Sequence, residues 1–503
     1  MKKKIESILI ANRGEIAIRI SVSAKKMGIK TFGIKTSKEP SAYYLQFVDE
    51  IVDFTEILSD IPEFLDIDRI IYAIKEYNID AVHPGYGYLA ENPYFAQKCN
   101  EEGIIFIGPS PDSIYKLGNK TIAKQLASRH NVPLLEGSNG NIRNVKHAKQ
   151  LAKTIGYPVI LKAASGGGGR GMRIVEKEAD IEKMFRMAQN EAEKAFADRS
   201  VFMEKYVRNP RHIEFQILAD HHGNIIHLGE RECSIQRKHQ KLIEESPSFA
   251  LNEELRSKMG ESAINIAKAS NYKNAGTVEF LLDELGDFYF MEMNTRIQVE
   301  HPVTEMVTGY DLIEWQIRIA QNEELSIKQE DVSLKGWAIE CRINAEDVQS
   351  GFTPYLGTVE KIHLSKGKNV RFDTGITEGS NVTASFDSML AKLICYGDTR
   401  EKAISNTLAT LNKLQIQGIK TTIPFCKAVL NHPKFKKGDI STSFIEKDME
   451  QLHYQEEDEE MIDAFWAALD HSVQLEIEDK TYVDYEKGKN ITPWLMNKRL
   501  KSL

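Results

Sequence analysis

Short apolar runs alternate with helical stretches over the first part of the chain. Residues 8–11 and 30–34 are apolar and strand-like, and residues 14–27 between them repeat apolar side chains at helical spacing. Two further apolar runs, at 80–83 and 104–107, end at glycine or proline. This alternation predicts an open parallel sheet with helices on both faces.

The turn after the first run carries no dinucleotide fingerprint. It reads Asn12-Arg13-Gly14-Glu15 and lacks the spacing GxGxxG. A dinucleotide site is therefore unsupported in this unit.

The pattern changes three times further along, which predicts four segments. A Rossmann-like unit occupies 1–117, and a second unit occupies 118–335, with a glycine-rich subdomain at about 135–206. Residues 336–448 form a third lobe of glycine-punctuated strands followed by a helix, and 449–503 form an extension that begins with an acidic run. Such a run is usually a solvated face or a linker.

Composition and charge narrow the class of protein. Of the 503 residues 42% are apolar, which is enough for buried cores, and the net charge of −8 argues against a general nucleic-acid surface. No apolar run reaches the about 18 residues of a membrane span, and the short apolar stretch after the first lysines does not read as a signal peptide. The five cysteines are far apart without CxxC pairs, so we expect reduced thiols and a cytoplasmic protein.

Four glycines follow a predicted strand in the second segment. Pro158–Lys162 reads as that strand, and a second strand resumes at Arg170–Val175. Glycine lets successive backbone N–H groups wrap around phosphate oxygens, and Lys162 would meet phosphate as a point charge. We interpret the segment as a hairpin whose glycine flap closes over a nucleotide; a flexible hairpin tip is the alternative. It is not a P-loop, because no GKS or GKT follows and no helix begins there.

Two more segments indicate contacts with a nucleotide or anion. Met203–Val207 could offer backbone groups to an adenine from a strand edge, although an ordinary amphipathic strand explains these residues more simply. Residues 231–241 form a basic cluster in an acidic protein, which reads either as an anion site or as a solvated loop.

Two carboxylates face each other in a predicted hairpin. Residues 277–282 and 288–294 are strand-like and flank a turn. If the turn is centred between Leu285 and Gly286, Glu279 lies opposite Glu292. Opposed carboxylates repel unless a divalent cation lies between them, and oxygen ligands beside phosphates suit Mg²⁺. A solvent-facing pair is the alternative.

The second strand of this hairpin continues with strict alternation. In an extended chain every second side chain from Glu292 to Glu300 is polar and shares one face. Straight extension would separate these two residues by about 26 Å. One small site therefore requires a bend after Asn294, which we predict; a solvated strand face is the alternative.

Nine motifs in this order resemble the biotin carboxylase subunit or domain of biotin-dependent carboxylases, in the ATP-grasp superfamily. They are ANRGEIA (11–17), HPGYGYLAEN (83–92), SGGGGRGM (165–172), MEKYV (203–207), RHIEFQ (211–216), CSIQRKHQK (233–241), EMNTRIQVEHPVTE (292–305), ECRINAED (340–347) and FDSMLAKLICYG (386–397). The resemblance covers about residues 5–448. It implies an ATP-grasp fold of mixed α/β and α+β type, with a Rossmann-like N-terminal domain, a glycine-rich lid subdomain and a C-terminal biotin-carboxylase lobe.

The resemblance also implies roles for single residues. ATP-binding positions are Lys120, Lys162, Gly168, Gly169, Glu204, Lys205, Val207, His212, Gln236, His239, Glu279 and Glu292. Metal ligands are Glu279, Glu292 and Asn294, and bicarbonate or biotin contacts are Lys241, Arg296, Gln298, Val299 and Arg342. Glu300 corresponds to the general base.

The chemistry of the family suits these residue types. Glu300 would deprotonate bicarbonate, which attacks the γ-phosphate of ATP while two Mg²⁺ or Mn²⁺ ions and Lys162 neutralise charge. The resulting carboxyphosphate would release CO₂ and phosphate, and the phosphate would remove the N1′ proton of biotin. Arg296 would stabilise the enolate, since a guanidinium stays charged and offers a planar fork. The glycine flap would exclude water.

Partners and alternatives follow from what the sequence lacks. It has no Met-Lys-Met hairpin of a biotin carrier and is short for a carboxyltransferase domain. We therefore expect the chain to work with a separate biotin carboxyl carrier protein and a separate carboxyltransferase subunit, without nucleic acid or membrane. The resemblance also implies a homodimer, because relatives are often homodimers. We expect an acyl-CoA as final acceptor, with a two-subunit pyruvate carboxylase as the alternative. The competing functions are another ATP-grasp ligase and a non-catalytic nucleotide-binding subunit. The extension from 449 either docks partner subunits or is loosely packed.

Overall fold

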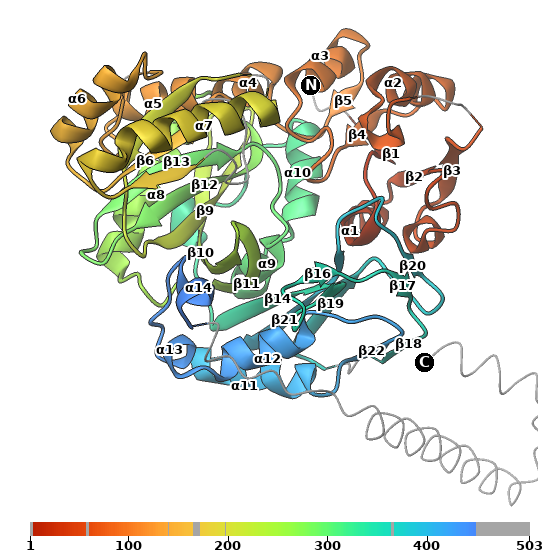
Figure 1. Ribbon diagram of the computed structural model, residues 1–503. Helices are drawn as coiled ribbons and strands as arrows, with labels where there is room; N and C mark the ends of the chain where they lie inside the picture. The colour runs from red at the N-terminus through yellow and green to blue at the C-terminus, as the bar shows by residue number, and fades with distance from the viewer. Residues whose placement is uncertain are drawn as a thin grey trace, which may run out of the picture. The chain divides into compact units, whose positions relative to one another are not determined.

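A computed structural model describes residues 4–56, 60–138, 140–163, 172–196, 198–363 and 367–448 (Figure 1). Gly168, Gly169 and the extension 449–503 lie outside the described residues. Among the helices described, none combines the length and apolar character needed to cross a bilayer.

The N-terminal unit is built on a five-stranded sheet in the order β3-β2-β1-β4-β5, and every neighbouring pair is parallel. Its strands are β1 (Ser7–Ile10), β2 (Lys30–Lys35), β3 (Glu50–Asp53), β4 (Ala81–His83) and β5 (Ile105–Phe106). The predicted parallel sheet is therefore confirmed. Gly14 begins helix α1 (Gly14–Lys26) with φ of +65°, a conformation that glycine adopts without strain.

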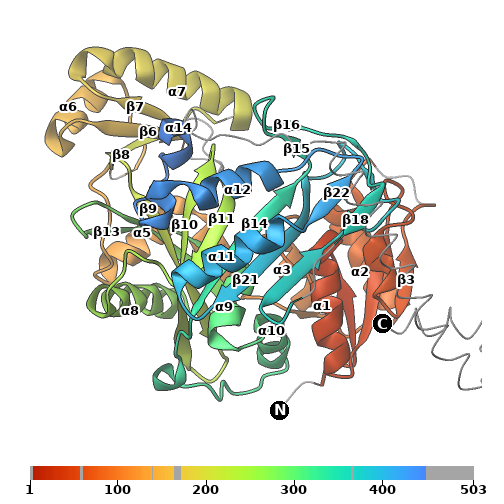
Figure 2. The same ribbon diagram turned by 90° about the horizontal axis from the view of Figure 1, so that it is seen from below.

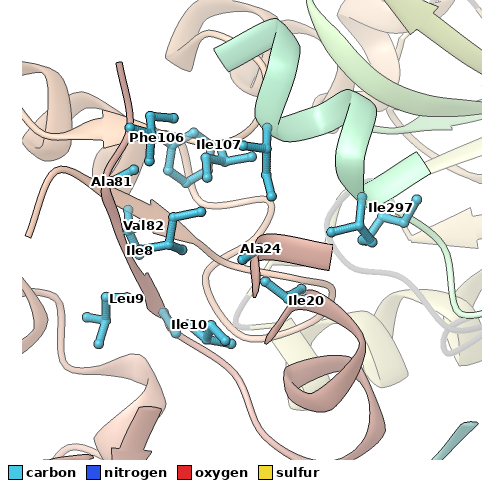
Figure 3. Packing of buried hydrophobic residues seen from close by; sticks show 14 of the residues in the cluster. Ile8, Leu9, Ile10, Ile20, Ala24, Ala81, Val82, Phe106, Ile107 and Ile297 are labelled. Carbon is cyan, nitrogen blue, oxygen red and sulfur yellow. The ribbon is translucent and has the colours of Figure 1, made fainter. Parts of the chain in front are cut away.

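The core of this unit continues into the second segment. Ile8, Ile10 and Ile20 pack in one buried cluster with Ile297, which lies in the loop after the alternating strand (Figure 3). Helix α10 (Leu312–Ala320) contributes side chains to the same cluster. Apolar packing therefore fixes that loop against the N-terminal unit.

An eight-stranded sheet forms the centre of the molecule, in the order β13-β12-β9-β10-β11-β14-β21-β19, with antiparallel neighbours. The strands are β9 (Arg211–Ala219), β10 (Ile225–Arg237), β11 (Gln240–Ser246), β12 (Asn274–Leu282), β13 (Phe288–Asn294), β14 (Trp337–Asn344), β19 (Val370–Thr374) and β21 (Met389–Gly397). Because β11 pairs with β14, the sheet runs without a break from the second segment into the third.

Two helices pack on the C-terminal strands of this sheet. Val303 and Val307 of α9 (His301–Thr308) cluster with Ala338 and Ile394. Helix α11 (Arg400–Leu411) also packs against β21 and β14. Since side chains alternate along a strand, Glu340 and Arg342 share the face of Ala338, which is covered by α9.

The strands on either side of the glycine run belong to a small separate sheet, β7-β6-β8, which lies with α6 (Val145–Ile155) and α7 (Ile181–Phe196) in Figure 2. Strands β6 (Val159–Ala163) and β7 (Arg173–Val175) are antiparallel, which confirms the predicted hairpin, and β8 (Val201–Lys205) pairs with β6. The subdomain has a hydrophobic cluster of its own.

The hairpin of β12 and β13 pairs Glu279 with Glu292, as predicted. The predicted turn centre is wrong, however, because the register shifts by one residue beyond this pair and the turn is centred on Leu285. Met291 is the extra residue, a β-bulge that brings the two carboxylates back into opposition. The predicted bend is confirmed, since β13 ends at Asn294 and the chain bends before α9.

Candidate active site

Three lysines converge on two carboxylates near the end of β6. Lys162, near the end of β6, donates to Glu204 on β8 with Nζ to Oε2 of 2.6 Å. Lys124, on α5 (Lys120–Arg129), also contacts Glu204. Lys120 Nζ lies 3.5 Å from Glu292 Oε2. The positive charges of this cluster exceed the negative ones by one, which favours an anionic ligand.

The pKa values of two of these lysines are lowered because the lysines are buried close to one another. Burial, together with the charges of Lys162 and Lys120, lowers the pKa of Lys124 to about 7. Burial and Lys120 lower the pKa of Lys162 to about 8, while Glu292 acts in the opposite direction. A bound polyphosphate would relieve this repulsion, so the cluster has the electrostatics of a phosphate site.

The segment expected to contact an adenine is only partly an open edge. Beyond its pairing with β6, β8 also bonds residues 136–138, because Lys205 N–H donates to Glu136 O at 2.8 Å. Up to Lys205 the backbone of this segment is therefore already paired, and Lys205 Nζ donates to the carbonyls of Gly156 (3.0 Å) and Tyr157 (3.2 Å). The chain leaves the strand after Lys205, so Val207 lies beyond the paired region.

The basic segment places its side chains at the sheet centre and at a turn. Gln236 Nε2 lies 3.4 Å from His212 Nδ1, and His212 Nε2 lies 3.0 Å from Glu279 Oε2. His239 is exposed in the turn between β10 and β11, with φ of +66°. Gln236 and His212 thus join the carboxylate pair, whereas His239 lies at its rim.

Lys241 links the carboxylates at the centre of the site. Its Nζ donates to Glu214 (2.6 Å), Glu279 (3.0 Å) and Glu300 (2.7 Å). Burial alone would lower the pKa of Lys241, but these three carboxylates raise it well above its usual value. One cationic side chain therefore ties the metal-type carboxylate Glu279 to the predicted base Glu300.

Glu300 is fully buried and held by two cations. Besides Lys241, Arg342 donates from NH2 to Glu300 Oε2 at 2.9 Å and from Nε to Glu244 at 2.6 Å. Burial would raise the pKa of Glu300, but Lys241, Arg342 and Arg231 hold it well below its usual range. Glu300 is therefore ionised at neutral pH, the state that accepts a proton.

The bend after Asn294 is clamped from the N-terminal unit. Arg296 Nε pairs with Glu91 at 2.9 Å, and Thr295 N–H donates to the same carboxylate at 3.0 Å. Arg296 NH1 donates to Gln298 Oε1 at 2.8 Å, and Gln298 in turn donates to Glu279 at 3.2 Å. A continuous chain of contacts therefore runs from Arg296 through the central carboxylate to the base.

Two of the predicted metal ligands, Glu279 and Glu292, offer carboxylate oxygens that suit a hard divalent cation. The amide oxygen of Asn294 accepts from Arg296 at 3.3 Å. Glu279 and Glu292 are directly opposed, and Asn294 Nδ2 donates to Glu279 Oε1 at 2.8 Å. Burial would raise the pKa of Glu279, but Lys241 and His212 lower it far below its usual value, so it is an anionic oxygen donor. Carboxylate and amide oxygens are the ligand types that Mg²⁺ and Mn²⁺ prefer.

Comparisons with known proteins agree with this geometry. Family models match the biotin carboxylase N-terminal domain at 4–114, the carbamoyl-phosphate synthase L chain ATP-binding domain at 119–328 and the biotin carboxylase C-terminal domain at 340–447. A biotin carboxylase of Nostoc is 48% identical over 444 residues, 88% of this chain and 99% of that protein. The chain belongs to the biotin carboxylase family.

Two further relatives of this family are parts of larger carboxylases. One of the pyruvate carboxylase subunits of Methanothermobacter thermautotrophicus is 44% identical over 461 residues, 91% of this chain and 94% of that one. The biotin carboxylase domain dimer of Hydrogenobacter thermophilus 2-oxoglutarate carboxylase, solved with MgADP, ADP and bicarbonate, has a TM-score of 0.86 and 44% identity over 90% of this chain and all of that one.

Sequence reasoning missed several members of this biotin carboxylase site. They are Glu91, Lys124, Glu214, Glu244 and Lys392. Glu214 and Glu244 interrupt apolar strands with a buried carboxylate, a signal that could have marked them. Lys124 has no such local signal, because its partner Glu204 lies on a distant strand.

Proposed function

We propose that this chain uses ATP to carboxylate biotin with bicarbonate, on a biotin carboxyl carrier protein that is a separate chain. One observation carries the proposal: Lys241 contacts the metal-type carboxylate Glu279 and the buried base Glu300 with the same ammonium group. A nucleotide bound through its metal and a bicarbonate bound beside the base would therefore meet at Lys241. This juxtaposition suits transfer of a phosphoryl group to bicarbonate.

The residues divide the first step between them. Glu300 takes the proton of bicarbonate, and a bicarbonate oxygen then bonds to the γ-phosphorus as the bond to the ADP oxygen breaks. Mg²⁺ or Mn²⁺ held by Glu279, Glu292 and Asn294 supplies charge neutralisation when bound. Lys120 and Lys162 add fixed positive charge at the phosphates.

The second step transfers CO₂ to biotin. Carboxyphosphate breaks into CO₂ and phosphate, the phosphate removes the N1′ proton of biotin, and N1′ attacks CO₂. Arg296 and Arg342 hold the enolate and carboxylate as planar donors. Both guanidiniums are already oriented, by Glu91 and by Glu244.

The remaining nucleotide contacts are assigned on the resemblance. They are Gly168 and Gly169 of the flap, Glu204, Lys205 and Val207 at the end of β8, and His212, Gln236 and His239. We divide the chain into an N-terminal domain at 1–117, an ATP-grasp domain at 118–335 with its lid at about 135–206, a C-terminal lobe at 336–448 and an extension at 449–503. The separate core of the lid subdomain supports its movement as a unit.

The partners we propose are the carrier protein, a second copy of this chain and a carboxyltransferase subunit, in the cytoplasm. For the final acceptor we retain an acyl-CoA. Two of the relatives named above belong to pyruvate and 2-oxoglutarate carboxylases, so a 2-oxo acid is the second candidate. Identification of the carboxyltransferase that co-purifies with the chain decides between them.

Phosphate release from ATP tests the function. We expect the purified chain to cleave ATP only when bicarbonate and biotin are both present. Arg296→Ala should lower this turnover by about 100-fold or more, the scale for loss of one preorganised charge-stabilising donor. Arg186→Ala, at an exposed position on α7, is the matched control. Wild-type turnover in Arg296→Ala would contradict the mechanism, and ATP cleavage independent of biotin would indicate another ATP-grasp ligase.

A further inference from the structure

Lys392 has no role among those given above, yet it is buried and contacts the loop that carries Val299 and Glu300. Lys392 of β21 is 0% exposed, which is rare for lysine unless its charge is paired. Its Nζ donates to the carbonyl of Val299 at 2.8 Å and lies 3.0 Å from Glu15 Oε1 and 3.9 Å from Asp373 Oδ2. If Lys392 served only to fill the core, an apolar side chain of similar size would do so without the free-energy cost of burying a charge.

The partners of Lys392 come from three parts of the chain. Glu15 lies in the first turn of α1 in the N-terminal unit and also accepts a hydrogen bond from Tyr86. Asp373 lies on the neighbouring strand β19, directly opposite Lys392. Val299 lies in the loop that joins the bend to α9. The ammonium group therefore fixes this loop to both flanking lobes.

Two successive backbone carbonyls of this loop are each contacted by a buried side chain. The carbonyl of Gln298 lies 2.8 Å from His301 Nδ1, and the carbonyl of Val299 accepts from Lys392. In a planar trans peptide the N–H points away from the C=O. Fixing these two carbonyls therefore sets the directions of the Val299 and Glu300 N–H groups.

The orientation of the base follows from the same restraint. The held peptide joins Val299 to Glu300, whose side chain must reach Lys241 on one side and Arg342 on the other. Rotation of this peptide would displace the carboxylate from both cations. The Glu300 N–H, which lies next to the position assigned to bicarbonate at Val299, would turn with the same peptide.

We propose that Lys392 is a positioning residue for bicarbonate: it holds the Val299–Glu300 peptide so that the carboxylate and the N–H group of Glu300 face the substrate. The inference rests on the proposed function, because bicarbonate is the substrate that the loop would bind. Lys392 itself touches neither nucleotide nor bicarbonate in this assignment. Its effect is therefore specific to bicarbonate, since the ATP contacts lie on other elements.

Steady-state kinetics of two variants test the proposal. Lys392→Met removes the donor and leaves Glu15 buried without its cation, so Lys392→Met/Glu15→Gln also removes the orphaned charge. In the double variant we expect the KM for bicarbonate to rise and kcat to fall by about 100-fold, the scale for a small misplacement of reacting groups. The KM for ATP should stay at the wild-type value. Lys402→Met, at an exposed position on α11 of the same lobe, is the control.

The possible results distinguish failure of the proposed function from failure of the role proposed for Lys392. If the wild-type chain lacks biotin- and bicarbonate-dependent ATP cleavage, the proposed function fails. If the wild type is active and a folded variant keeps the wild-type KM for bicarbonate, only the role of Lys392 is overturned. Equal changes in both KM values, or loss of folding in both variants, would mark Lys392 as purely structural and overturn the inference as well.

Discussion

Replacing His83 with glutamine should make the stability of this protein less sensitive to acid. His83 ends β4 and is fully buried, and its Nδ1 accepts the N–H of Gly85 at 3.0 Å. An acceptor nitrogen requires the neutral ring, with the proton on Nε2. Burial, with a contribution from the charge of Arg19, lowers the pKa of His83 to about 3, although Gln316 opposes the shift.

The sign of the effect follows from this lowered pKa. The unfolded chain protonates His83 near pH 6.5, whereas the folded chain does so only near 3. The stability that comes from the neutral ring is therefore complete above about pH 6.5 and is lost as the pH falls toward 3. Well inside this window each pH unit costs about 1.4 kcal/mol, and because the unfolded ring is half protonated at pH 6.5, the change from pH 6.5 to 4.5 costs about 2.3 kcal/mol.

Thermal unfolding followed by circular dichroism measures this cost. An entropy of about 2.1 cal/mol/K per residue gives about 0.9 kcal/mol/K for the folded body, so 2.3 kcal/mol corresponds to about 3 °C. The Tm of the wild type minus that of His83→Gln should therefore shrink by about 3 °C between pH 6.5 and 4.5. His130→Gln, at an exposed position, should show no such trend. A Tm difference that stays constant over this range would refute the reasoning.

Two further predictions concern the metal site and the C-terminal core. Glu292→Gln removes one of the opposed carboxylates, so the Mn²⁺ concentration for half-maximal ATP cleavage should rise by about tenfold or more; an unchanged Mn²⁺ titration, with Glu284→Gln in the exposed hairpin turn as control, would contradict the assignment. Phe425→Ala empties a fully buried site that packs edge-on against Phe352, and should cost about 3–5 kcal/mol, seen as a Tm lower by several degrees. A Tm within experimental error of the wild type would show that this core does not limit stability.

Local periodicity was enough to predict that Glu279 lies opposite Glu292, although the predicted centre of the turn between them was wrong. Side chains alternate strictly along a strand, so a register error of one residue would have placed Glu279 and Glu292 on opposite faces. The bulge at Met291 cancelled the misplaced turn centre at Leu285. No sequence pattern predicted that bulge, because it depends on how the two strands pair and not on the conformational preference of one residue.

The bend after Asn294 could be predicted because distance alone required it. The residues that stabilise it could not, since Glu91 comes from the N-terminal unit and Lys392 from β21 in the C-terminal part of the sheet. Their positions depend on how β14 and β21 align and on how the N-terminal unit packs against the loop. These long-range alignments leave no trace in local spacing, whereas carboxylates such as Glu214 inside apolar strands do.

The central sheet continues without a break across the boundary at residues 335 and 336, so the parts on either side of that boundary would move together. Lys241 and Arg342 lie on adjacent strands of one continuous sheet, and both donate to Glu300. Lys162 belongs to a different, smaller sheet with its own interior. A swing of the small sheet would therefore open the phosphate end for ADP to leave while the pocket around Glu300 keeps its shape, ready for the next turnover.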